Sequence, residues 1–299
     1  MTSRQMAARL PRSPISRINL LLAALVVLGL TANNPTAANE GVRNLFIFAI
    51  LISAIVGLHE MSHLLAARAF KIRVLSFAIG FGPELLKADR WGIHWSLNLL
   101  PFGGFVKLHG EDADVGPDSF VSAAPWKRIL VLLAGPVSNL IAAFATLMGM
   151  ALVSGVALAE APGKAMLALL AIWNATVDAI ASYLPHAASA PLDVPFSGIP
   201  GMVSASGLLL DQGVFSLFLL VAALNLSLGI MNLLPIPPMD GGQATLIGGE
   251  AVMGRFYPKR LARMLQVGGL AFMVVLMVFI NGVDLLRMLL GQGALFSGV

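Results

Sequence analysis

The stretch NLFIFAILISAIVGLHEMSHLLAARAF, residues 44–70, is the most informative part of the sequence about the fold. It is long and apolar enough to cross a hydrocarbon core of roughly 30 Å, which takes about 20 such residues in a helix. Its second half nevertheless carries the ionisable residues His59, Glu60 and His63. Ionisable side chains at membrane depth are costly and mark functional sites. The stretch therefore predicts a membrane-spanning helix that carries a functional site.

The composition of the whole chain agrees with a membrane protein. Of its 299 residues, 58% are hydrophobic and 11% are charged, whereas soluble domains carry about 25% charged residues. The net charge is +4, but the basic residues flank apolar runs, where they orient helices. We therefore predict the lipid bilayer as a partner and no nucleic acid. Cysteine is absent, which excludes disulfides and thiolate ligands.

Four apolar segments are long enough to cross the membrane: 44–70, 129–158, 213–239 and 266–290. Basic residues follow the first segment and precede the second, so by the positive-inside rule these ends lie inside. The chain is therefore predicted to be an all-α polytopic membrane protein. Its core has three helices, and the C-terminal span is the fourth.

The two ends of the chain are predicted to lie outside the membrane domain, which covers residues 44–290. Residues 1–17 carry four arginines, and a short apolar stretch and a polar segment follow them. Residues 1–43 therefore read as a signal peptide or an N-terminal anchor with an outer linker, and both readings stay open. Residues 291–299 form a C-terminal tail.

Two segments between the spans have different patterns. Residues 72–110 contain short runs of strand-forming residues separated by Gly and Pro turns, which predicts a small strand-rich element, re-entrant or interfacial. Residues 163–184 have an apolar stripe at helical spacing and a polar face with Asn174, Asp178 and Ser182. That pattern predicts an amphipathic helix lying on the outer surface of the membrane.

His59-Glu60-Met61-Ser62-His63 is an H-E-x-x-H motif on the predicted helix 44–70. Residues four apart lie one above the other on a helix face. The imidazoles of His59 and His63 can therefore bind one zinc ion at about 2.0–2.1 Å. Glu60 lies beside them and is placed to act as a general base. The motif predicts one Zn²⁺ per chain.

The third ligand has to come from elsewhere in the chain, because the metzincin extension H-x-x-G-x-x-H is absent. Asp240 is the leading candidate, since it ends the stretch NLLPIPPMDGG, residues 232–242, in which three prolines break a helix at membrane depth. By itself this stretch is also typical of a helix-ending turn. Glu111 and Glu250 remain alternative third ligands.

The H-E-x-x-H motif together with Asn232-x-x-Pro235-x-Pro237-x-x-Asp240-Gly241 resembles the site-2 protease family of intramembrane zinc metalloproteases. The segments Pro101–Lys107 and Ala134–Asn139 are similar to its bacterial branch. This resemblance implies that Asp240 is the third zinc ligand and that Asn232 contacts the substrate backbone. Many bacterial members have a PDZ insertion, but residues 159–212 are too few and lack its strand pattern.

The predicted function is intramembrane endoproteolysis of membrane-anchored proteins or peptides, in signalling or in the clearance of membrane peptides. The turn at Gly103 and Gly104 is a further candidate for contact with the substrate backbone. The alternative is a catalytically silent or non-proteolytic metal-binding protein, such as a transporter or scaffold. We expect a bacterial inner membrane location with the active site toward the cytoplasm. The sequence assigns neither a particular substrate nor an oligomeric state.

Overall fold

The structure is a computed structural model that describes residues 37–111, 116–183, 198–254 and 257–290. Residues 1–36 of the predicted signal peptide or anchor and the C-terminal tail lie outside the described residues. Residues 37–43, predicted as an outer linker, form the first turns of α2, so this helix begins earlier than the predicted span 44–70. Seven helices and two strands follow one another in the described part. They are α2 (Ala37–Ala69), β1 (Val74–Arg90), β2 (Ile93–Leu108), α3 (Pro125–Val153), α4 (Ala161–Tyr183), α5 (Ile199–Asp211), α6 (Val214–Leu233), α7 (Asp240–Met253) and α8 (Lys259–Leu289).

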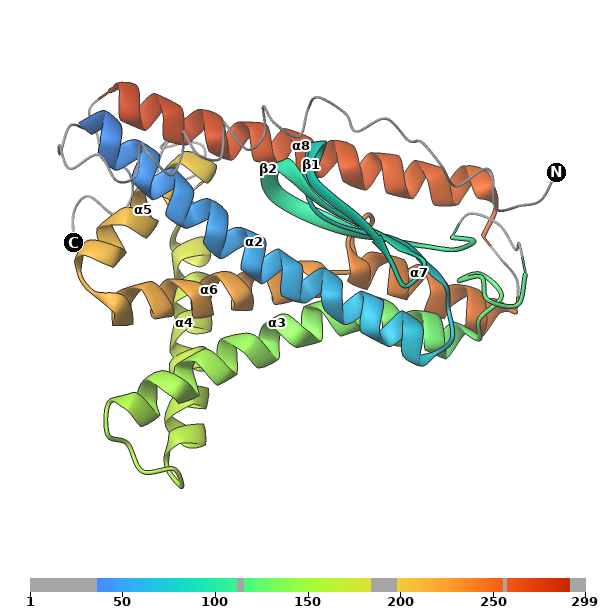
Figure 1. Cartoon of the computed structure of the whole chain (residues 1–299), viewed down its shortest axis with the longest axis horizontal. Coiled ribbons are helices and arrows are strands. Elements are labelled where there is room, and N and C mark those ends of the chain that lie inside the picture. The colour runs from blue at the N-terminus through green and yellow to red at the C-terminus, as the bar shows by residue number, and fades with distance from the viewer. Residues whose placement is uncertain (1–36, 112–115, 184–197, 255–256, 291–299) are drawn as a thin grey trace.

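Four of the described helices are long and apolar enough to cross a membrane: α2, α3, α6 and α8. This confirms the predicted all-α polytopic fold with a three-helix core and a C-terminal span. In Figure 1, α2 and α6 run in one direction and α3 and α8 run in the opposite direction. The C-terminal ends of α2 and α6 therefore lie on the same side of the molecule.

The predicted span 213–239 is too long at its C-terminal end, because α6 ends at Leu233. Pro235, Pro237 and Pro238 follow, and proline can neither donate a backbone hydrogen bond nor fit within a helix interior. A new helix, α7, begins at Asp240. This break turns the chain, so that the first residue of α7 points back toward α2. The short helix α5 was not predicted either; Pro200 lies in its first turn, a position that proline favours.

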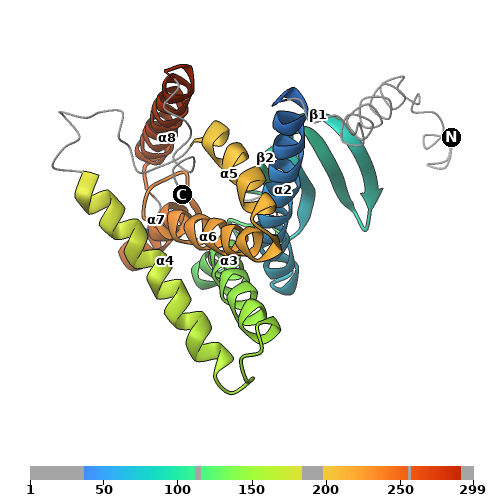
Figure 2. The ribbon, with the colours of Figure 1, turned by 90° about the vertical axis from the view of Figure 1, so that its left-hand side faces the viewer.

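Helix α4 coincides closely with the predicted amphipathic helix 163–184. It is not among the four described helices that could cross a membrane. In Figures 1 and 2 it runs across the direction of α8 instead of alongside it. A small apolar cluster of Leu147, Ala165 and Ala222 joins it to α3 and α6. These features support an interfacial position, which stays a prediction.

Strands β1 and β2 confirm the predicted strand-rich element and form one antiparallel hairpin with several register shifts. The first part of β1 has partners on both sides, because Phe77 pairs with both Val106 and Trp95 of β2. The last part of β2, from Gly104 to Leu108, pairs with the first part of β1 alone. It is therefore an edge of the sheet. Figure 2 shows the hairpin beside α2.

The main hydrophobic core lies where the hairpin meets the C-terminal part of α2, the N-terminal part of α3 and α7. Its buried members include Leu64 of α2, Phe77 of β1, Val131 of α3 and Ile247 of α7. Burial of each such side chain contributes about 1.5–3 kcal/mol. This core fixes α2, α3 and α7 relative to one another, and these three helices build the site described below.

Candidate metal centre

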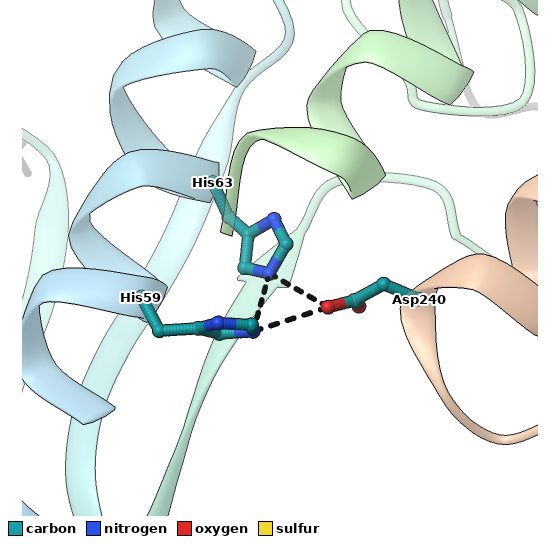
Figure 3. Close-up of side chains that lie close together, drawn as sticks. All are labelled: His59, His63 and Asp240. Atoms are coloured by element: carbon teal, nitrogen blue, oxygen red, sulfur yellow. Dashed lines mark hydrogen bonds and ion pairs between the residues drawn. The ribbon is translucent and has the colours of Figure 1, made fainter. Parts of the chain in front are cut away.

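His59 and His63 are one helical turn apart on α2 and face the same side, as their spacing predicts. Both are buried, with exposed fractions of 6% and 7%. Asp240, in the first turn of α7, faces them across the space between the two helices (Figure 3). The structure therefore brings together three residues that lie up to 181 positions apart in the chain.

The three side chains converge on one point. The Nε2 atoms of the two histidines are 3.1 Å apart. The Asp240 Oδ2 atom lies 3.1 Å from Nε2 of His59 and 3.3 Å from Nε2 of His63. Within the described residues, this is the one group of three metal-binding side chains close enough to share an ion.

The donor set fits zinc. Ligands that bind zinc tetrahedrally at 2.0–2.1 Å lie about 3.3 Å from one another, close to the separations seen here. Two imidazole nitrogens and a carboxylate oxygen are also ligands that catalytic zinc sites use. Without an ion, three electron-rich atoms would face one another in a buried site. These three residues therefore fit zinc as its protein ligands, and a set of three would leave one of four coordination positions open.

The ring of His63 is oriented by the neighbouring helix. Its Nδ1–H donates a hydrogen bond of 2.7 Å to the backbone carbonyl of Val131 in α3. This bond places the proton on Nδ1 and leaves the Nε2 lone pair for the metal. The Nδ1 atom of His59 is buried and has no hydrogen-bond partner among the described residues.

Glycines allow the backbones to approach the metal closely. A Cβ atom at Gly135 of α3 would overlap the ring of His63 and lie 2.7 Å from Nε2 of His59. A Cβ atom at Gly241 or Gly242 would overlap the backbone of residues 233–237. The glycines after Asp240 therefore let α7 fold back against the end of α6, and this places the carboxylate at the histidines.

Glu60 lies in a cavity of about 880 Å³ that His63, Asp240 and the edge of β2 also line. Strand β2 lies against Glu60: a Cβ atom at Gly104 would lie 3.0 Å from Cγ of Glu60, and the Val106 backbone is hydrogen-bonded to its carboxylate. The Glu60 carboxylate, two of the metal-binding residues and a strand edge thus line the same cavity. Such an arrangement can place a peptide beside a general base and a Lewis acid.

The remaining predicted site residues occupy different places. Gly104 lines the cavity, whereas Asn232 and Gly103 are not among its lining residues. The Asn232 side chain donates to the Leu228 carbonyl of its own helix. Glu111 accepts the Leu108 N–H, and Glu250 accepts the Tyr257 N–H. Neither of the two alternative third ligands belongs to the described metal group.

Two further histidines pair with carboxylates away from this group. His94 lies between Asp89, at 2.7 Å, and Glu84, at 2.8 Å. These hydrogen bonds, first that of Asp89, raise the pKa of His94, and His94 in turn lowers the pKa of Glu84. His109 lies 3.2 Å from Asp118. Both histidines are thus hydrogen-bonded to nearby carboxylates, in the hairpin and in the loop that follows it.

Sequence reasoning missed three contributors to the site: the Val131 carbonyl, Gly135 and Arg128. A backbone carbonyl has no sequence signature. Gly135 lies in the segment Ala134–Asn139, which resembles the family, but one sequence does not say which helix that glycine approaches. Arg128 looks like an ordinary basic residue at the inner end of a span, yet it is buried and lines the cavity.

Four apolar helices around a buried set of two histidines and one aspartate define the chain as a membrane-embedded zinc-site protein. Residues 47–276 match the family described as "Peptidase family M50". The chain belongs to this family.

The similar proteins include candidate zinc metalloproteases from several bacteria. One from Chlamydia pneumoniae is 42% identical over 108 residues, which cover 32% of this chain and 17% of that protein. One from Thermotoga maritima is 35% identical over 117 residues, covering 37% of this chain and 23% of that protein. One from Agrobacterium fabrum is 25% identical over 325 residues, covering 70% and 86%. The chain thus matches less than a quarter of the length of the first two.

Proposed function

We propose that this chain is an intramembrane zinc endopeptidase that hydrolyses peptide bonds within or near membrane-spanning segments of membrane-anchored substrates. The observation that carries the proposal is the convergence of His59, His63 and Asp240 beside Glu60 in a cavity between apolar helices. Membership in peptidase family M50 supports the same chemistry. The proposed physiological role is regulated signalling or the clearance of membrane peptides.

The residues divide the work of hydrolysis. His59, His63 and Asp240 hold zinc, which when bound acts as a Lewis acid and lowers the pKa of water to about 7. Glu60 is not a ligand in this arrangement, so its carboxylate is free to take a proton from the attacking water. The same carboxylate then delivers that proton to the leaving amide nitrogen. Removal of such a base typically costs about 10²–10⁴-fold in rate.

The hairpin supports the binding of an extended substrate. A helical peptide bond is shielded and hydrogen-bonded within its own helix, so a membrane-spanning substrate must unwind before hydrolysis. Residues Gly104 to Leu108 are a sheet edge that faces the cavity. An unwound peptide can add to such an edge as a further strand, with backbone hydrogen bonds supplying affinity. Gly104 would then lie opposite the scissile bond, while a substrate contact of Asn232 would need a change of its hydrogen bond to Leu228.

The proposed location is the bacterial inner membrane, with the metal site toward the cytoplasm. This orientation follows from Arg68 in the last turn of α2, from Lys71 and Arg73 just after it, and from the basic start of α8. It also requires α4 to lie on the outer surface without crossing. Because the chain has no cysteine, single cysteines can report the side of each position cleanly.

Cysteines near Gly163 and near Pro191 should both react with an impermeant thiol reagent from outside intact cells. A cysteine near Lys259 should react only after the membrane is opened. Labelling of positions 163 and 191 from opposite sides would show that α4 crosses the membrane. The inner ends of α2 and α6 could then not meet as the metal site requires.

The proposed activity is tested with the purified chain in detergent and a tagged model substrate that has one membrane span and a glycine-rich centre. The wild-type chain should cut the substrate within or beside its span. Glu60→Gln should keep one zinc per chain, because Glu60 is not a ligand, but lose cleavage by about 10²–10⁴-fold. Near-normal cleavage by that variant would remove Glu60 from the mechanism. A wild-type chain that holds zinc and cuts nothing would favour the non-proteolytic alternative.

A further inference from the structure

Arg128 is a buried cation in the wall of the substrate cavity. It lies one turn before Val131 on α3, about 4.5 Å along the helix axis, and the Val131 carbonyl orients the metal-binding ring of His63. Its side chain lines the same cavity as Glu60 and Asp240, and only 8% of the residue is exposed. A charged side chain is thus kept within reach of anything that occupies the cavity.

The guanidinium group has no hydrogen-bond partner among the described residues. Its Nε atom is buried without an acceptor. The Phe120 ring lies 5.2 Å away and offers only a cation–π contact. Buried donors without partners are rare in proteins, because each loses its bonds to water without replacement. Nε is closed off from the cavity as well, so the two Nη groups are the donors that an acceptor in the cavity can reach.

Glu250 balances the charge of Arg128 without occupying its donors. The closest distance between the two groups is 3.9 Å, whereas charge-assisted hydrogen bonds are about 2.7–2.9 Å long. The other oxygen of Glu250 accepts the Tyr257 N–H. By contrast, Arg43 at the surface donates to Asp211 over 2.9 Å. An ordinary structural pair would close to that distance.

We propose that Arg128 is a substrate-binding residue that donates hydrogen bonds to main-chain carbonyl oxygens of the extended peptide in the cavity. This inference rests on the proposed endopeptidase function. A peptide strand added to the edge of β2 has carbonyls along its other edge that the sheet does not pair, and the guanidinium fork offers donors in fixed directions. An acidic side chain fits less well, because Glu111 and Glu250 already line this part of the cavity.

The placement also indicates which part of the substrate is bound. Arg128 is about one helical turn from the level of the metal ligands, and an extended peptide rises about 3.3 Å per residue. The contacted carbonyls therefore belong to residues within about three positions of the scissile bond. Because main-chain carbonyls occur in every peptide, this contact positions the chain without selecting its sequence.

The binding test uses the full chain with Glu60→Gln, which holds the substrate without cutting it. The probe is a fluorescein-labelled peptide of the model span that the wild-type chain has been shown to cut. Arg128→Gln should weaken binding of the probe about tenfold or more, because bonds to charged groups are lost. Arg128→Lys should recover only part of the affinity, since an ammonium lacks the fork. Lys127→Gln, a loss of the same charge from the adjacent position, should bind within about twofold of the parent.

One double variant and one kinetic measurement separate an effect on binding from an effect on folding. Arg128→Gln with Glu250→Gln removes the buried charge pair and leaves no lone charge, so it should keep zinc and stay folded but still bind weakly. In the cleaving background, Arg128→Gln should raise KM more than it lowers kcat, as expected for binding shared by ground and transition states. Recovery of full affinity in the double variant would make Arg128 a structural residue and overturn the proposal.

A matched peptide with one Asp near its cleavage site tests the other source of oxygen atoms. If Arg128→Gln weakens the acidic and neutral peptides equally, the contact is with the main chain. A penalty confined to the acidic peptide would replace the main-chain assignment with recognition of a side-chain carboxylate. Equal binding of the neutral peptide by all variants would overturn the inference, while prior cleavage of that peptide by the wild-type chain leaves the proposed function standing.

Discussion

Helix α3, which orients a metal-binding histidine, and helix α8, which lines the cavity beside the metal site, pack differently against the rest of the protein. In α3, 33% of the most apolar window is buried within the protein, against 11% in α8. Helix α3 presses Gly135 onto the histidine rings, whereas α8 lines the cavity with Gln266 and Leu270 and supplies no metal ligand. In Figure 1, α8 runs along one side of the molecule.

One attachment of α8 is close packing, because a Cβ atom at Gly269 would overlap the Pro237 carbonyl. A second attachment is polar and lies near its C-terminal end. Asp284 is buried and accepts the backbone N–H groups of Gly198 and Gly201, at the start of α5. Asn281 accepts the N–H of Ile199. These bonds satisfy donors that the first turn of a helix leaves unpaired. Close packing of α3 against α2 therefore fixes the metal geometry, whereas these hydrogen bonds fix the C-terminal end of α8 to α5.

The largest effect is expected for a substitution in α3 beside the metal-binding histidines. In Gly135→Ala, the new methyl group would overlap His63 and crowd His59, so α3 or the rings must move. A displacement on the order of 1 Å of reacting groups costs about 10²-fold in rate. We expect zinc content to fall and cleavage to drop by about that factor or more. Metal analysis and the cleavage assay measure both.

Gly149→Ala is the control for that substitution. Gly149 lies in the same helix, and a Cβ atom there would meet nothing within 4 Å. Because alanine is the better helix former by about 1 kcal/mol, this variant should keep its zinc and activity. Full zinc content and full activity in Gly135→Ala would show that close packing of α3 against the histidines does not fix the metal geometry.

The next effect is on stability and not on the metal, and it is expected at the hydrogen bonds that join α8 to α5. Asp284→Ala removes the acceptor of two buried hydrogen bonds, each to a charged group and therefore worth about 1.5–3 kcal/mol. We expect easier proteolysis of α8 and a lower melting temperature, with zinc content unchanged. Asn281→Ala removes a single neutral bond and should have a weaker effect in the same direction. Loss of zinc in Asp284→Ala would mean that α8 helps to hold the metal, against the comparison.

Part of this site could be predicted from the sequence, and the limits have physical causes. The H-E-x-x-H spacing places His59, Glu60 and His63 by local helix geometry alone. The four spans follow from hydropathy, and the hairpin follows from strand-forming residues and turns. Asp240 needed the family resemblance, because a third ligand 181 residues away is set by how α6 breaks and α7 turns back.

The rest depends on contacts between distant elements. The Val131 carbonyl and Gly135 act through the approach of α3 to α2, which no local pattern encodes. Arg128 has the sequence context of an orienting charge, and only its burial in the cavity wall distinguishes it. Helix α7 was not predicted, because the prolines before it indicated a turn that ends the preceding helix. Its apolar face is buried only after the chain has made that turn.

Metal analysis of purified Asp240 variants tests the central claim most directly, because the account depends on one zinc shared between α2 and α7. Asp240→Ala removes the ligand that α7 supplies and should lose both bound zinc and cleavage, since three protein ligands are needed to hold the ion. Glu111→Ala and Glu250→Ala, which remove the two alternative ligands, should each keep one zinc per chain. Full zinc occupancy in Asp240→Ala, with loss in either glutamate variant, would contradict the proposed site.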